Sequence, residues 1–61
     1  MRVRVDHDRE QLWVQKYKQV KIGEYKVDFT SDEEEVFHFD NDDYMLVLFE
    51  AWFPGKVLLC E

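Results

Sequence analysis

The sequence predicts a mainly β fold, a small antiparallel meander that forms a barrel or an open roll. Three observations support this prediction. Polar and apolar residues alternate from Arg2 to Asp6, as in a strand with one buried face. The pair Gly23-Glu24 separates two apolar runs, and Pro54-Gly55 makes another tight turn. The 61 residues suffice for a single domain, 1–61.

The Gly23-Glu24 pair predicts a hairpin with a type II′ turn, because glycine comes first in the loop. In that register Ile22 pairs with Tyr25 and Val20 pairs with Val27. The register places all the apolar side chains of this segment on one face of the hairpin. These are Val20, Ile22, Tyr25, Val27 and Phe29.

Residues 8–19 fit two patterns. Trp13, Tyr17 and Val20 are spaced as on one face of a helix, and this spacing supports an α+β alternative with one short helix near residues 8–19 packed on an antiparallel sheet. Leu12 and Val14 instead continue the strand parity of the following hairpin. We favour a strand for this segment, and the helix remains the alternative.

The second half of the chain predicts further strands. Val36 to Phe39 and Tyr44 to Phe53 flank Asp40 to Asp43, a turn-forming run, so we expect a second hairpin. The segment from Tyr44 to Phe53 is apolar on both faces, which indicates a central strand covered on both sides. After Pro54-Gly55, Lys56 to Cys60 forms the last strand.

Charge divides the chain into two unlike halves. Residues 1–26 carry seven basic and four acidic side chains, a net charge of +3, whereas residues 27–61 carry one lysine and ten carboxylates, a net charge of −9. Eight of these carboxylates lie between Asp28 and Asp43. Mutual repulsion of this size opposes folding, which suggests that the acidic run has a use.

The sequence favours binding over catalysis. Side chains that act as nucleophiles, bases or metal ligands are few, and no pattern brings them together, so we expect no enzyme activity, cofactor or metal site. They are Thr30, Ser31, Cys60, His7 and His38. The lone cysteine cannot form an internal disulfide, which fits a reducing, cytoplasmic location. The longest apolar run is about half of a membrane span, so we expect no membrane role.

We therefore expect a non-catalytic acidic binding protein, an inhibitor that docks on the basic surface of a nucleic-acid-binding protein as a DNA mimic. Small acidic inhibitors of this size and charge are typical of phages and mobile elements. The expectation requires the carboxylates to be gathered on a rigid patch of the sheet, with two tryptophans as aromatic anchors at its rim. The expected binding residues are Asp32, Glu33, Glu34, Glu35, Asp40, Asp42, Asp43, Trp13 and Trp52.

Two alternatives remain. An assembly subunit would use the apolar strand 44–53 to complete a sheet in a homodimer or larger complex. A weak nucleic-acid binder would use the lysines of the first half with Trp13 and Tyr17. Because the overall negative charge repels phosphate, we expect no direct nucleic-acid partner. The lysines are Lys16, Lys18, Lys21 and Lys26.

Overall fold

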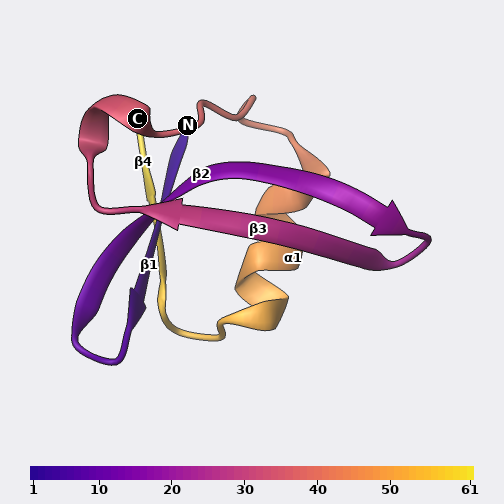
Figure 1. Ribbon diagram of the computed structural model, residues 1–61, viewed down its shortest axis with the longest axis horizontal. Coiled ribbons are helices and arrows are strands. Elements are labelled where there is room, and N and C mark those ends of the chain that lie inside the picture. Colours follow the sequence, from indigo (N-terminus) through magenta and orange to yellow (C-terminus); the bar gives the residue numbers. More distant parts are fainter.

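A four-stranded antiparallel sheet with one α-helix against it makes up the computed structural model, which describes residues 1–61 (Figure 1). The strand order is β3-β2-β1-β4, and the sheet does not close into a barrel. The mainly β prediction is confirmed, and the single α-helix is formed by residues 44–52, not by residues 8–19. In chain order the elements are β1 (Arg2–His7), β2 (Glu10–Lys21), β3 (Glu24–Thr30), the 3-10 helix η1 (Glu33–Glu35), α1 (Tyr44–Trp52) and β4 (Val57–Cys60).

The first two strands form a tight hairpin that confirms a strand in place of the alternative helix at residues 8–19. His7 pairs with Glu10, so the loop consists of two residues, Asp8 and Arg9. Both have positive φ, 48° and 68°, as a type I′ turn requires. This turn matches the right-handed twist of the strands, although neither residue is the glycine that such positions favour.

A β-bulge interrupts β2 at Gln15. Val14 pairs with Phe29 and Lys16 pairs with Asp28, so Gln15 has no partner of its own on β3. The additional residue reverses the alternation of side chains along β2. Val14 points into the core before the bulge, and Tyr17 packs on the same core after it. Lys16 and Lys18 therefore lie on the outer face of the sheet.

The β2–β3 hairpin is present as predicted, but its predicted register is wrong. Lys21 pairs with Glu24, so the loop is Ile22-Gly23, with Gly23 at φ 78°. A second irregularity leaves Val20 unpaired between Gln19 and Lys21. As a result, Val20 and Ile22 are exposed instead of sharing the apolar face of the hairpin.

Residues 36–53 differ most from the sequence prediction, because they form no second hairpin. Residues 36–39 are extended without being a strand, and the backbone of Phe39 exchanges two hydrogen bonds with that of Met1. Tyr44–Trp52 is helix α1, not a central strand. Asp43 caps it by accepting a hydrogen bond from the Met45 N–H at 2.9 Å. The chain leaves the helix at Phe53, directly before Pro54.

The core lies between α1 and the inner face of the sheet. Phe49 is its largest fully buried side chain and contacts Phe39 and Trp52 edge to face. The buried residues of the core come from β1, β2, the segment before α1, and α1 itself. They are Val3, Val5, Val14, Phe39, Met45, Leu46 and Phe49. No helix of the structure combines the length and apolar character needed to span a bilayer, and α1 has only nine residues.

The last strand follows a turn that the sequence predicts correctly. The Lys56 N–H donates to the Phe53 carbonyl at 3.0 Å, which closes a turn around Pro54 and Gly55. Gly55 has φ 76°, as expected for glycine in the third position of a type II turn. The turn directs the chain back along β1, with which β4 pairs at the free edge of the sheet.

Candidate functional site

The first acidic segment forms a small turn at the end of β3. Asp32 accepts a hydrogen bond from the Glu34 N–H at 2.9 Å and so caps η1. Glu35 accepts from Gln15 Nε2 at 3.3 Å and from the Thr30 hydroxyl at 3.5 Å. Asp32 and the three glutamates of η1 are all exposed.

The second acidic segment precedes α1 and is not the hairpin turn that the sequence predicts. The Asp43 N–H donates to the Asp40 carbonyl at 3.1 Å, which closes a turn just before the helix. Asp43 is half-buried because its carboxylate caps the helix. Asp40 and Asp42 are exposed, and their side chains make no hydrogen bond within the chain.

The two acidic segments are joined by residues 36–39 and lie along the upper edge of the molecule in Figure 1. We call them together the acidic edge. No Lys or Arg side chain approaches any of its carboxylates within 4.0 Å, since the three ion pairs of the structure lie elsewhere. The acidic edge lies on turns and helix starts beside the sheet, not on the sheet itself, and its expected role in binding a partner stays a prediction. Its residues are Asp32, Glu33, Glu34, Glu35, Asp40, Asp42 and Asp43.

The extended segment that joins the two parts is fixed to the sheet at two points. The Phe37 N–H donates to the Val14 carbonyl at 3.0 Å. At the other end, the Met1 amino group donates to the Phe39 carbonyl at 2.6 Å, and the Phe39 N–H donates to the Met1 carbonyl at 2.8 Å. The acidic turns therefore flank a short stretch of backbone that is bound to β2 and to Met1.

The two tryptophans occupy unlike positions. Trp13 is only 7% exposed, so it does not lie at a rim as expected. Its ring lies on the outer face of the sheet, where the Arg2 guanidinium carbon is 5.2 Å from the ring centroid. Trp52 is 39% exposed at the end of α1 and contacts Tyr25. Of the two expected anchors, only Trp52 presents a substantial surface to solvent.

Two arginines of β1 share that outer face with Trp13. Arg2 also donates to the Glu61 carbonyl at 2.9 Å. Arg4 Nε lies 3.3 Å from Asp6 Oδ1, but this charge contact lacks hydrogen-bond geometry, so Arg4 Nε has no hydrogen-bond partner. Both arginines are half-buried, and their charges are directed at groups of the chain itself.

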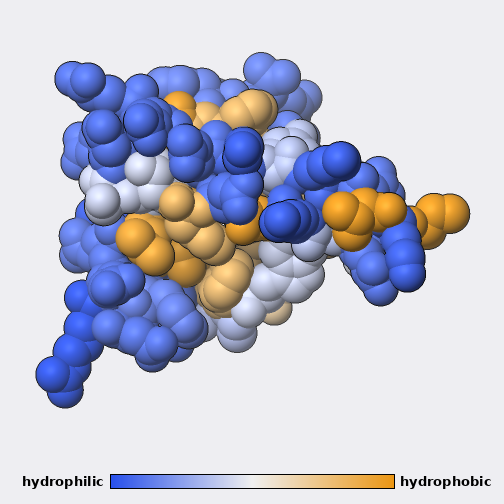
Figure 2. Space-filling view, in the orientation of Figure 1, coloured by the Kyte–Doolittle hydropathy of each residue, from blue (hydrophilic) through white to orange (hydrophobic).

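Exposed apolar side chains form surfaces that the sequence interpretation missed. On α1, Tyr44 is 67% exposed and Val47 is 59% exposed, so the outer side of the helix carries apolar side chains next to the exposed Glu50. Leu58 and Leu59 are exposed on the edge strand β4. In the space-filling view the apolar tip of the β2–β3 hairpin stands out from polar surroundings (Figure 2).

The groups with catalytic chemistry lie apart. The Thr30 hydroxyl accepts a hydrogen bond from the Asp32 N–H at 3.0 Å, an ordinary turn contact. His7 lies 3.2 Å from Asp8 in an exposed turn, and Cys60 is half-buried on β4. No three side chains among His, Cys, Asp and Glu are placed to share a metal ion.

The remaining concave feature is a shallow cleft of about 440 Å³ on the β2–β3 hairpin. Lys16, Lys18 and Lys26 line it, together with Tyr17 and Asp28.

Comparisons of the chain with protein-family models, curated proteins and solved structures give no match. The charged surfaces of the molecule are therefore the basis for a functional proposal.

Proposed function

We propose that the protein is a non-catalytic binding protein that docks its acidic edge onto a basic surface of another protein. The observation that carries the proposal is that seven carboxylates lie on two neighbouring turns without a Lys or Arg within 4.0 Å. Unpaired charges of one sign destabilise a fold. A cationic partner would relieve this repulsion and would also be steered toward the acidic edge during association.

The form of inhibition that fits this surface best is competition with nucleic acid. A protein that binds DNA presents a basic groove, and carboxylates held on short turns offer such a groove negative charges in place of phosphates. Trp52 lies at the end of α1 opposite to Asp43, so the exposed aromatic side chains next to the acidic edge are Phe37 and Tyr44. The proposal therefore predicts that the partner is a nucleic-acid-binding protein and that duplex DNA displaces the chain from it.

The test compares two variants of equal net charge. The edge variant E33Q/E34Q/D40N/D42N removes four carboxylates that make no side-chain hydrogen bond, and it leaves the capping residues Asp32 and Asp43 intact. The control variant removes four exposed carboxylates elsewhere on the chain. It is E10Q/E24Q/E50Q/E61Q.

A partner captured from host lysate by the wild-type chain is purified, and its affinity for each variant is measured by calorimetry at several salt concentrations. We expect the edge variant to bind at least about tenfold more weakly, a loss of about 1.4 kcal/mol, and the control to stay within about twofold. The wild-type affinity should fall as salt rises. An equal loss in both variants, or an affinity insensitive to salt, contradicts docking by the acidic edge.

A second function, as an assembly subunit, is favoured by the exposed apolar side of α1. Tyr44 and Val47 are more than half exposed on a helix that is apolar all round except for Glu50. The expected pairing through a strand at residues 44–53 is wrong because this segment is helical. Sedimentation velocity separates the two functions, since a concentration-independent monomer supports the inhibitor and a tight oligomer that V47E dissociates supports assembly.

A further inference from the structure

The β2–β3 hairpin extends beyond the rest of the sheet as a two-stranded arm. We call residues 16–28 the arm; they run from Lys16 through the Ile22-Gly23 loop to Asp28. In Figure 1 the arm reaches to the right past α1, and its tip lies at the opposite end of the long axis from η1. Ile22 at the tip is 98% exposed. The exposed side chains of the arm do not pack in the core, and this suggests that the arm contacts another molecule.

The outer face of the arm is positively charged. Lys18 lies directly opposite Lys26 in the strand register, and like charges in this arrangement destabilise a sheet. Neither ammonium has a carboxylate within 4.0 Å. Only Lys16 is paired, with its Nζ 3.7 Å from Asp28 Oδ2. Together with Lys21, these residues give the arm four lysines against two carboxylates.

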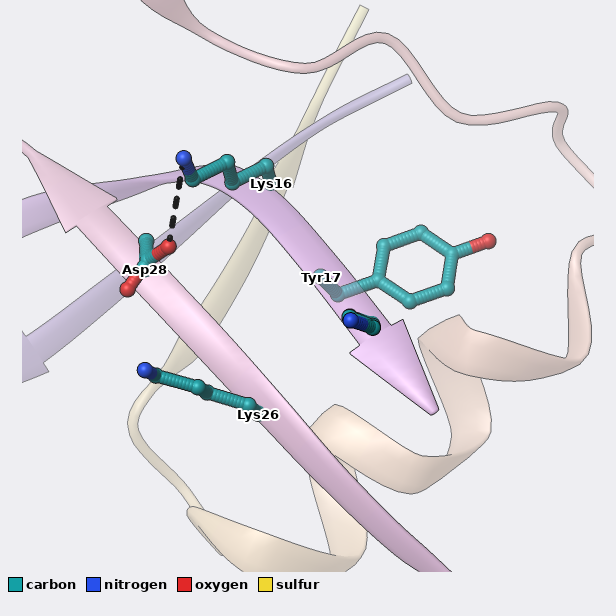
Figure 3. A pocket seen from close by; sticks show the side chains of 5 residues that line it. Lys16, Tyr17, Lys26 and Asp28 are labelled. Carbon is teal, nitrogen blue, oxygen red and sulfur yellow. Dashed lines mark ion pairs between the residues drawn. The ribbon is translucent and has the colours of Figure 1, made fainter. Parts of the chain in front are cut away.

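Lys16, Lys18 and Lys26 border the shallow cleft of about 440 Å³ on the arm. Figure 3 shows Lys16 and Lys26 on either side of Asp28, with the dashed ion pair joining Lys16 to Asp28. The Tyr17 side chain points away from these groups (Figure 3). It stacks on Phe39 with the ring centroids 5.5 Å apart, so its ring belongs to the core side of the hairpin.

We propose that the lysine face of the arm binds the phosphate backbone of duplex nucleic acid. Lysine ammonium groups bind phosphates with release of counterions, without sequence preference. A duplex fits better than a single strand because single-strand binding sites stack bases on aromatic rings, and Tyr17 is turned away from the lysines. A two-stranded ribbon also has the right width for the major groove, which the exposed Ile22 at the tip would enter.

The net charge of −6 does not prevent this contact. The longest dimension of the molecule is 30 Å, and η1 with its glutamates lies at the far end of it from the arm tip. At physiological salt the Debye length is about 8 Å, so charges separated by more than this are largely screened from one another. A phosphate on the outer face of the arm is therefore screened from η1, and it meets four lysines against the two carboxylates of the arm, Glu24 and Asp28.

The test measures fluorescence anisotropy of a labelled 20-base-pair DNA duplex on titration with the full chain between 50 and 200 mM salt. Contact with three phosphates predicts a slope of about −2.7 for log association constant against log salt, or a loss of about 40-fold over this range. In K18Q/K26Q the slope should shrink by about 1.8 and the affinity should drop at least about tenfold. The matched control R9Q/K56Q removes two exposed cations outside the arm and should stay within about twofold of wild type.

Folding and alternative ligands are followed in parallel. K18Q/K26Q should melt no lower than wild type, because it removes a like-charge pair from exposed positions. Equal loss in K18Q/K26Q and R9Q/K56Q, or undetectable duplex binding at 50 mM salt, overturns the proposal. Tighter binding to a single-stranded oligonucleotide, or binding only to phosphatidylserine vesicles, also overturns it. The edge variant should bind the duplex at least as well as wild type, so this proposal and the docking proposal fail separately.

Discussion

Substitutions at Val47 and Phe49 test the helical structure of residues 44–52 directly. The two residues are two apart, so they would share a face in a strand but lie about 200° apart around a helix. In the structure Phe49 is 0% exposed, whereas Val47 is 59% exposed. The helix therefore predicts very different costs for V47A and F49A, while a strand buried on the Phe49 side predicts a loss at both positions.

The magnitudes follow from burial. F49A removes a ring that contacts Phe39 and Trp52, and truncation of a buried phenylalanine costs about 3–5 kcal/mol. A domain of 61 residues has a total stability of about 3–9 kcal/mol, so F49A should lose at least about a third of it. V47A should change stability by less than about 0.5 kcal/mol, and the higher helix propensity of alanine offsets part of any loss.

Urea unfolding followed by tryptophan fluorescence and by far-ultraviolet circular dichroism measures both effects. Trp52 contacts Phe49 and Trp13 is buried on the outer face, so fluorescence reports on both sides of the sheet. F49L retains most of the buried volume and should remain folded, with a loss below about 1.5 kcal/mol. A V47A variant that loses more than about 1.5 kcal/mol, or matches F49A, would refute the assignment of Val47 to the outer side of α1.

Three substitutions test the local backbone. R9G should raise the melting temperature by about 4 °C, because Arg9 adopts φ 68° and this left-handed conformation costs a non-glycine residue about 1–2 kcal/mol. The control R9A removes the same charge without adding a glycine and should give no gain. G23A should lower the free energy of unfolding measured in urea by about 1 kcal/mol, because Gly23 has φ 78°. There is space for the added methyl group, so the loss comes from the backbone conformation alone. An unchanged urea midpoint would argue against this turn. D43A should lower the free energy of unfolding by about 0.5–2 kcal/mol, because it removes the N-cap of α1. The control D42A removes a neighbouring carboxylate that does not cap the helix and should be near neutral.

Much of the sheet was predictable from local patterns. Alternation at Arg2–Asp6 identified β1, and the Pro54-Gly55 pair located the turn before β4. The β2–β3 hairpin was located correctly, but its register was not, because glycine occupies the second loop position after Ile22. Glycine supports a positive φ at either loop position of a hairpin, so the pair Gly23-Glu24 alone did not determine the register.

Helix α1 was missed because its sequence is apolar on every side. Eight of its nine residues are apolar, so no period of 3.6 distinguishes a helix from a strand covered on both faces. Two signals nevertheless favour the helix. Asp43 is a good N-cap residue, and the length from Tyr44 to Phe53 before Pro54 exceeds that of a typical strand. Length and capping residues therefore contained information that hydrophobic periodicity did not.

The residues of the acidic edge could be predicted from the sequence, but the backbone conformation that carries them could not. The sequence contains the seven carboxylates, and its pattern predicted a hairpin turn at Asp40–Asp43. In the structure these residues form a turn directly before α1, and Asp43 caps the helix. Burial of Trp13 beneath Arg2 also had no local signal, because it depends on pairing between β1 and β2. Such contacts join residues that are distant in the sequence, and local patterns do not record them.

The bulge at Gln15 determines where the lysines of β2 point. Without the additional residue, Lys16 and Lys18 would continue the inward alternation of Val14 and would enter the core. With it, they lie on the outer face of the arm, and Tyr17 takes the inward position. Charged side chains at apparently inward positions in a strand therefore indicate a bulge between them and the preceding apolar residues.

The same bulge connects the two charged surfaces of the molecule. The inward Tyr17 stacks on Phe39, which also pairs with Met1 in the segment between the two acidic turns. Gln15 itself, at the bulge, donates a hydrogen bond to Glu35 of η1. The bulge thus directs Lys16 and Lys18 to the outer face of the arm and provides a hydrogen bond to η1, which carries part of the acidic edge.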